Sequence, residues 1–367
     1  MNLSPALKKA YTKEHLSALE ARHRAEWIAW GPAVFQASRL MVKLGILPLI
    51  ADNHEGLTRQ EICSATGLSD YAVKCLLEAS LCIGTVLADP ETDRYRLSKT
   101  GWFLLNDDAV QVNMDFNHDV NYEGWFRLEE SLREGRPAGL EHFGPWPTVY
   151  EGLSELPPLA RDSWLAFDHY YSDSSFPQAL QIVFDEHHVR SLYDVGGNTG
   201  KWALKCVGYD PQVKVTVLDL PQQIEMMKQN IAGHDGADRI SGYPIDLLNP
   251  QAKFPKFPEA PDAIWMSQFL DCFSMDQIVD ILRRAREAMS SRTRIYIMET
   301  LWDRQKYDTA ALCLTMTSLY FTAIANGNSK MYNTEDLQAC IDKAGLKTEK
   351  IYDNLGRGHS IVVVSAP

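Results

Sequence analysis

Several features are missing from this sequence, and each absence excludes a class of protein. No apolar run reaches the roughly 18 residues that a membrane span requires, so we expect no membrane-spanning segment. Residues 1–27 follow a polar helical pattern without an apolar stretch, which predicts that they are not a secretory signal. The seven cysteines are odd in number and form no Cys-x-x-Cys pair, which favours reduced thiols and a cytoplasmic location.

Basic residues are in the minority as well. The chain has 36 Lys and Arg against 48 Asp and Glu, a formal net charge of −12. Such a chain has no general attraction to nucleic acid or to an anionic membrane. Its 367 residues, 45% hydrophobic and 23% charged, are ordinary for a globular protein and predict two or three domains with a large core.

A helix–turn–helix–hairpin pattern occupies residues 58–97. Thr58 and Glu61 predict a capping box at the start of a short helix, and a second helix is expected over 70–83. Two strands around a "DPETD" turn complete a winged helix. The second helix offers one lysine, Lys74, and no row of Arg or Asn for phosphates and bases. A subunit interface is therefore favoured, and a DNA-binding regulator is the weaker alternative.

The chain divides into three predicted regions. Residues 1–105 form the helical and winged-helix domain, and residues 106–185 form a helical linker rich in aromatic residues. In residues 186–367 short apolar strands alternate with helices, which is typical of a mostly parallel sheet with crossover helices. The predicted fold class is therefore α/β.

Glycines gather directly after the first strand of this last region. The run "LYDVGGNTG" reads as a strand, a glycine turn and the start of a helix, with Gly196, Gly197 and Gly200 allowing close approach of a ligand. The next strand ends in Asp219, where an acid can accept both ribose hydroxyls of a nucleoside. The third strand leads into Asp246, which is placed to accept an adenine amino group.

These motifs resemble those of the S-adenosylmethionine-dependent small-molecule O-methyltransferases of the caffeic acid O-methyltransferase class. In that family the loop reads DVGGGTG, and here Asn198 takes the place of the middle glycine. The resemblance extends to "VLDLP", "RISGYPIDLL", "ILRRAREAM" and "FDHYYSDSSFPQAL", and so covers nearly the whole chain. It implies a Rossmann-like seven-stranded methyltransferase domain, preceded by an all-helical and winged-helix dimerisation domain.

The same resemblance implies the cofactor and its contacts. The cofactor would be S-adenosyl-L-methionine, with Ser175 at its methionine carboxylate, Asp219 at the ribose, and Asp246 with Leu247 at the adenine. The partners would be a small-molecule acceptor and a second copy of the chain, without nucleic acid, membrane or metal. The implied cofactor residues are Ser175, Asp194, Gly196, Gly197, Gly200, Asp219, Leu220, Asp246, Leu247 and Ser267.

The acceptor half of the site departs from the family. The family's fourth strand runs into a His-Asp-Trp triplet whose His is the general base, and ungapped matching places Asp271, Cys272 and Phe273 there. Of the two acids that orient that His, one is kept as Glu299 and the other becomes Met331. Proton transfer from a phenol to an ordinary Asp is uphill by roughly 6 pKa units, on the order of 8 kcal/mol. Burial and a neighbouring acid would narrow that gap.

Three interpretations of Asp271 follow. It is the base, with a perturbed pKa; or it orients an acidic or amine acceptor; or methyl transfer has been lost and the pocket has another use. His118 and His169 are alternative bases. We predict methyl transfer to a hydroxyl of a small, aromatic molecule, with Asp271 and Glu299 as the catalytic residues. The predicted acceptor-binding residues are Phe116, Trp125, His169, Tyr171, Asn326 and Met331.

Overall fold

A computed structural model describes residues 3–185, 187–257 and 259–367 of the chain. The chain divides into two compact units, one formed by Glu14–Asp119 and the other by Met1–Lys13 together with Val120–Pro367. The predicted division at residues 105 and 185 is not tested by these units and stays a prediction.

The Glu14–Asp119 unit contains the expected winged-helix elements. A three-stranded antiparallel sheet has the order β1-β3-β2, and Thr58 and Glu61 form the predicted capping box. Its elements are α2 (Ala18–Ala29), α3 (Gly31–Lys43), α4 (Ile46–Ala51), β1 (Leu57–Thr58), α5 (Arg59–Thr66), α6 (Asp70–Ile83), β2 (Val86–Asp89), β3 (Arg94–Leu97), α7 (Lys99–Asn106) and α8 (Asp108–Phe116), followed by the π-helical turn η1 (Asn117–Asn121). Large apolar side chains stay exposed on this unit: Leu19, Trp27, Ile28, Trp30, Leu40, Leu44, Tyr71, Leu81, Leu87, Trp102 and Phe103.

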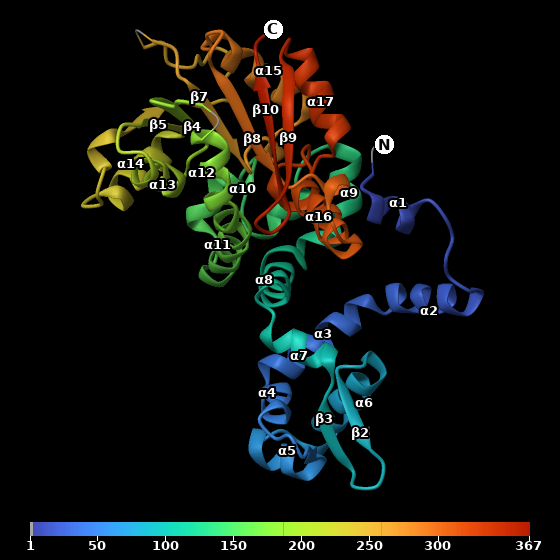
Figure 1. Ribbon diagram of the computed structural model, residues 1–367. Coiled ribbons are helices and arrows are strands. Elements are labelled where there is room, and N and C mark those ends of the chain that lie inside the picture. Colours follow the sequence, from blue (N-terminus) through green and yellow to red (C-terminus); the bar gives the residue numbers. More distant parts are fainter. Residues whose placement is uncertain (1–2, 186, 258) are drawn as a thin grey trace. The chain divides into compact units, whose positions relative to one another are not determined.

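The larger unit is built on a seven-stranded sheet of order β6-β5-β4-β7-β8-β10-β9 (Figure 1). Within this described sheet β10 runs antiparallel to both of its neighbours, and the other paired strands are parallel. The strands are β4 (Ser191–Val195), β5 (Lys214–Asp219), β6 (Ile240–Pro244), β7 (Ala263–Ser267), β8 (Arg294–Glu299), β9 (Lys347–Leu355) and β10 (His359–Ser365). The predicted Rossmann-like sheet is confirmed. The strand order reverses between β4 and β7, and open α/β sheets bind ligands at the carboxyl ends of such strands.

Alternating side chains of the strands build one apolar core on each face of the sheet. On β7, Ala263 and Trp265 face one core while Ile264 and Met266 face the other. The first core is covered by α12 (Phe176–Phe184), α13 (Lys201–Tyr209) and α14 (Pro221–Ile231), and the second by α15 (Met275–Glu287) and α17 (Thr334–Lys343). Trp202 of α13 stacks on Trp265 with ring centroids 4.1 Å apart, which fixes the glycine-turn helix on the sheet.

The remaining helices of this unit lie outside the sheet layers. They are α1 (Pro5–Tyr11), α9 (Leu128–Glu134), α10 (Val149–Gly152), α11 (Pro158–Ser172) and α16 (Asp308–Tyr320), with the short turns η2 (Gly124–Arg127), η3 (Ala138–His142), η4 (Leu153–Glu155), η5 (Asp173–Ser175), η6 (Ala237–Arg239), η7 (Leu270–Cys272), η8 (Trp302–Arg304) and η9 (Phe321–Ala325). Contrary to expectation, one stretch, Asp308–Ala325, has the length and apolar composition of a membrane span. This is weak evidence for a span, because core helices of soluble proteins meet the same test.

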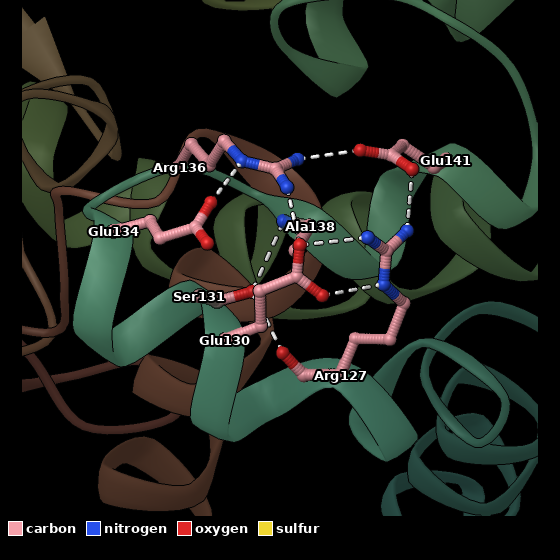
Figure 2. A network of polar contacts seen from close by, with 7 residues as sticks. All are labelled: Arg127, Glu130, Ser131, Glu134, Arg136, Ala138 and Glu141. Atoms are coloured by element: carbon pink, nitrogen blue, oxygen red, sulfur yellow. Dashed lines mark hydrogen bonds and ion pairs between the residues drawn. The ribbon is translucent and has the colours of Figure 1, made fainter.

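An ionic network holds the loop between α9 and η3 (Figure 2). Arg127 binds Glu130 and Glu141, and Arg136 binds the same two acids. Gly327, with φ of +85°, lies so close to Arg136 that a Cβ would come within 2.4 Å of its backbone. Single surface ion pairs contribute little to stability, but a network with bidentate pairs fixes the geometry of the loop that carries it. The network therefore holds the backbone of Arg136, against which Gly327 packs in the chain that follows η9.

Candidate active site

The glycine loop after β4 is held by the acid at the end of β5. Gly196, Asn198 and Gly200 have φ of +70°, +48° and +77°, the left-handed region that glycine and asparagine tolerate best. The backbone N–H of Asn198 donates to Oδ2 of Asp219 over 2.8 Å, and the N–H of Leu220 donates to Oδ1 over 2.7 Å. The loop and Asp219 thus form one edge, and the predicted contact of Asp219 with the ribose stays a prediction.

Asp194 lies beneath this loop and is 2% exposed. A Cβ on Gly197 would come within 2.5 Å of its Oδ2, and that oxygen has no hydrogen-bond partner among the residues described. Burial raises the pKa of Asp194 to about 8, with a further contribution from Asp219, whose own pKa is also raised by burial. A ligand that brings hydroxyl donors and positive charge fits this edge.

Other predicted cofactor residues lie at the same edge of the sheet. Ser267 ends β7, and Asp246 follows β6, where its Oδ1 accepts from the N–H of Leu248 over 2.9 Å. Leu247 is buried. These positions agree with the expected layout, and their roles stay predictions.

Ser175 has a different environment. It is fully buried, its Oγ lies 2.8 Å from Nδ1 of His359, and it donates to the carbonyl of Leu355 over 3.4 Å. These contacts join the start of α12 to the hairpin of β9 and β10. The predicted contact of Ser175 with the methionine carboxylate stays a prediction.

Two buried carboxyls stand at the ends of β7 and β8. Asp271 in η7 and Glu299 at the end of β8 are each 5% exposed. Oε1 of Glu299 accepts from the N–H groups of Phe269 and Leu270 over 3.1 and 2.9 Å. Its Oε2 is buried and has no partner in the part of the chain that the structure describes. Oδ1 of Asp271 accepts from the thiol of Cys272 over 3.5 Å.

The environment shifts the titration of both acids. Burial, with a contribution from the nearby Asp168, raises the pKa of Asp271 to about 7. Burial and then the charge of Asp271 raise the pKa of Glu299 well above its ordinary value. An aspartate that ionises near neutral pH is a far stronger base than an ordinary one.

The turn that carries Asp271 is preceded by a residue with a strained backbone. Gln268 has φ of +44°, and its N–H donates to the carbonyl of Met298 over 2.9 Å. Such backbone strain is concentrated at functional sites. Its side-chain Oε1 is buried, and no described residue donates to it.

A small cavity adjoins both acids. Its lining consists of Leu270, Asp271, Glu299, Thr300, Leu301, Met331, Tyr332 and Leu337. Met331, placed by sequence matching where the family has an acid, does lie beside the two carboxyls. Its sulfur accepts from Oγ1 of Thr300 over 3.7 Å.

The predicted acceptor residues are only partly brought together. Asn326 is close to the acids, because its amide donates to the carbonyl of Cys272 over 2.7 Å. His169 and Tyr171 lie on α11, and Trp125 lies on η2 with a buried Nε1 that has no partner within the described ranges. Phe116 belongs to the Glu14–Asp119 unit, so its role stays a prediction.

Sequence reasoning missed three residues near Asp271. Tyr150 of α10 has a buried hydroxyl beside Cys272, and its pKa is raised by burial and by Cys272. Asp168 of α11 and Tyr320 of α16 are also close enough to act on each other electrostatically. All three come from helices without a motif. Tyr150 and Asp168 lie within the aromatic-rich residues 106–185, whereas no such signal marked Tyr320.

The described residues contain no cluster of three or more His, Cys, Asp or Glu that could hold a metal ion.

Comparison with known proteins gives matches over both units. Residues 22–95 match the model of the Dimerisation2-like domain, and residues 171–347 match that of the O-methyltransferase domain. The L-tyrosine C(3)-methyltransferase of Streptomyces lavendulae is 26% identical over 329 residues, 88% of this chain and 86% of that protein. The mitomycin biosynthesis 6-O-methyltransferase of the same organism is 23% identical and covers 86% of each chain. The S-adenosylmethionine-dependent methyltransferase SibL, known from its crystal structure, is 25% identical in sequence. The two structures match with a TM-score of 0.70 over 93% of this chain and 98% of that one.

Proposed function

The chain belongs to the S-adenosylmethionine-dependent O-methyltransferases of small-molecule biosynthesis, and we propose that it methylates a hydroxyl of a small aromatic acceptor with Asp271 as the base. Its cofactor is S-adenosyl-L-methionine, which when bound supplies an electrophilic methyl group on a positively charged sulfur. The glycine loop and Asp219 would hold the nucleoside, with Asp246 and Leu247 at the adenine. Asp194 offers negative charge beneath the loop.

The observation that carries the proposal is the environment of Asp271. With a pKa of about 7, Asp271 lies about 3 pKa units below a phenol of pKa about 10, on the order of 4 kcal/mol. An ordinary Asp would face roughly twice that cost. Asp271 accepts the hydroxyl proton while the acceptor oxygen forms its bond to the methyl carbon and the carbon–sulfur bond breaks. Alignment of these atoms supplies most of the acceleration, and the base adds a further factor.

A second candidate is methylation of a ring carbon next to a phenolic hydroxyl. The similar L-tyrosine C(3)-methyltransferase favours it, because its name places the methyl group on carbon. Asp271 would again remove the hydroxyl proton, and the phenolate would attack through the neighbouring ring carbon. That carbon then loses its own proton and the hydroxyl is restored.

The assembly and location remain proposals too. The Dimerisation2-like match over residues 22–95 and the exposed apolar side chains of that unit support a homodimer. A cytoplasmic location stays a prediction.

The test is a screen of phenols, amines and carboxylic acids with labelled S-adenosylmethionine, with the site of methylation read by mass spectrometry and NMR. We expect Asp271→Asn to lower kcat on a phenol by about 100-fold or more, the usual contribution of a positioned base. Asp271→His should retain activity, because His is the base that the family uses.

Calorimetric titration with S-adenosylhomocysteine separates binding from chemistry. We expect the same affinity for the parent protein, for Asp271→Asn and for Asp276→Asn, an exposed acid that serves as the matched control. Full activity of Asp271→Asn on a phenol would show that Asp271 is not the base. Tight cofactor binding without any methylated product would indicate a member that has lost methyl transfer.

A further inference from the structure

The cavity beside Asp271 and Glu299 has room for one water molecule. Its volume is about 10 Å³, at the lower bound of the about 10–15 Å³ that a single buried water needs. Its polar lining residues are Asp271, Glu299, Thr300 and Tyr332, and a buried water there would take its two to four polar partners from them.

The two oxygens of Glu299 differ in their partners. Oε1 accepts two backbone N–H groups and the N–H of Asp271 also acts on this carboxyl, whereas Oε2 makes no hydrogen bond to a described residue although the side chain is 5% exposed. Buried polar atoms are almost always paired, so Oε2 calls for an explanation. A carboxylic acid explains the asymmetry, since Oε1 then acts as the carbonyl oxygen and Oε2 carries a proton that it donates into the cavity.

The neighbouring carboxyl gives the reason for this proton. Asp271 lines the same cavity, and neither acid forms an ion pair with any Lys or Arg in the described part of the chain. Two buried carboxyls that line one small cavity resist ionising together near neutral pH, because buried like charges repel, and Asp168 adds a further charge against the ionisation of Asp271. Asp271 already accepts a hydrogen bond from the thiol of Cys272, which suits the ionised partner.

We propose that Glu299 works as a neutral, protonated acid that donates through one bound water to the carboxylate of Asp271, and so positions that base. This rests on the proposed function in so far as Asp271 is the base. The role of Glu299 here differs from that of an ionised Glu that supports a His base, because Glu299 and Asp271 together hold one negative charge. Burial raises the pKa of both acids, with the charge of Asp168 adding for Asp271 and the charge of Asp271 adding for Glu299, which agrees with a protonated Glu299.

Two substitutions of Glu299 distinguish a neutral acid from a carboxylate at this position. Gln reproduces a neutral acid, since its carbonyl accepts the same two N–H groups and its NH₂ donates into the cavity. We expect Glu299→Ala to lower kcat by about 100-fold and Glu299→Gln to recover most of that loss, with the acid limb of the pH–rate profile still near pH 7. If Glu299→Gln is as inactive as Glu299→Ala while both bind S-adenosylhomocysteine normally, Glu299 acts as a carboxylate and the proposal is wrong.

An infrared measurement decides the same question without an acceptor. At pH 7 the difference spectrum of the parent protein minus Glu299→Gln should contain the C=O band of a protonated carboxylic acid, over the background of the protonated Asp194 that both proteins share, and Asp271→Asn should retain that band. Absence of a difference between the parent protein and Glu299→Gln would overturn the proposal even if no acceptor is ever found. Loss of methyl transfer with the band present would instead count against the proposed function alone.

Discussion

Asp194 gives a prediction that needs no knowledge of the acceptor. The side chain is 2% exposed at the end of β4, and burial raises its pKa from 3.8 to about 8, with Asp219 adding to the shift. The perturbation is Asp194→Asn, which keeps the shape and removes the ionisable group.

The size and sign of the pH effect on the free energy of unfolding follow from proton linkage. The shift of Asp194 is about 4 pKa units at about 1.4 kcal/mol each, on the order of 5 kcal/mol. Because the folded-state pKa is the higher one, the folded protein binds the proton more tightly than the unfolded chain. The stabilisation is complete below the unfolded value near pH 4 and is lost as the pH rises through about 8. The Asp194→Asn variant has no such loss, because its amide does not titrate.

The assay is urea unfolding at pH 5, 6.5 and 8 without cofactor. We expect the difference in free energy of unfolding, Asp194→Asn minus parent protein, to rise by several kcal/mol between pH 5 and pH 8. Each kcal/mol corresponds to roughly 2–4 °C in Tm. Asp235→Asn, at an exposed position, controls for the loss of one negative charge. Parallel pH curves for the parent protein and Asp194→Asn would refute the argument.

Two further predictions concern the same edge of the sheet. Tyr150→Phe removes a buried, neutral donor near Asp271. We expect kcat to fall about tenfold with unchanged S-adenosylhomocysteine affinity, as for loss of one hydrogen bond to the reacting oxygen. An unchanged kcat would contradict this prediction. Gly196→Ala should abolish calorimetric binding of S-adenosylhomocysteine, because φ is +70° and the new Cβ would lie 2.3 Å from the ring of Phe269. Gly208→Ala, in open space on α13, should bind normally, and equal binding by both variants would sink the explanation.

The cofactor edge was predictable from sequence for a geometric reason. Parallel strands end at one edge of a sheet, so acids and glycines that follow successive strands must meet there. The hydrogen bond from Asn198 to Asp219 joins residues 21 positions apart and follows directly from that rule. The tolerance of asparagine for positive φ was likewise readable from the residue type.

The acceptor side was not predictable in the same way. Tyr150 and Asp168 come from helices whose packing has no short-range signal, and only the folded chain places them near Asp271. The contact between Ser175 and His359 spans 184 positions and involves a hairpin that no motif marks. The apolar stretch of Asp308–Ala325 is interrupted by four threonines and one serine, which hid its length.

The exchanges at 271 and 331 are best understood together. In the resembling family a neutral His is supported by two acids, so the site holds two carboxyls. Here Asp271 adds a carboxyl and Met331 removes one, so two carboxyls line the cavity, and Asp168 acts on Asp271 from outside it. A third carboxyl in this cavity would raise the cost of ionising Asp271, because each buried like charge disfavours the next. Met331 fills that position with an uncharged side chain that accepts from Thr300. The loss of one supporting acid is therefore the condition under which an aspartate can replace the base.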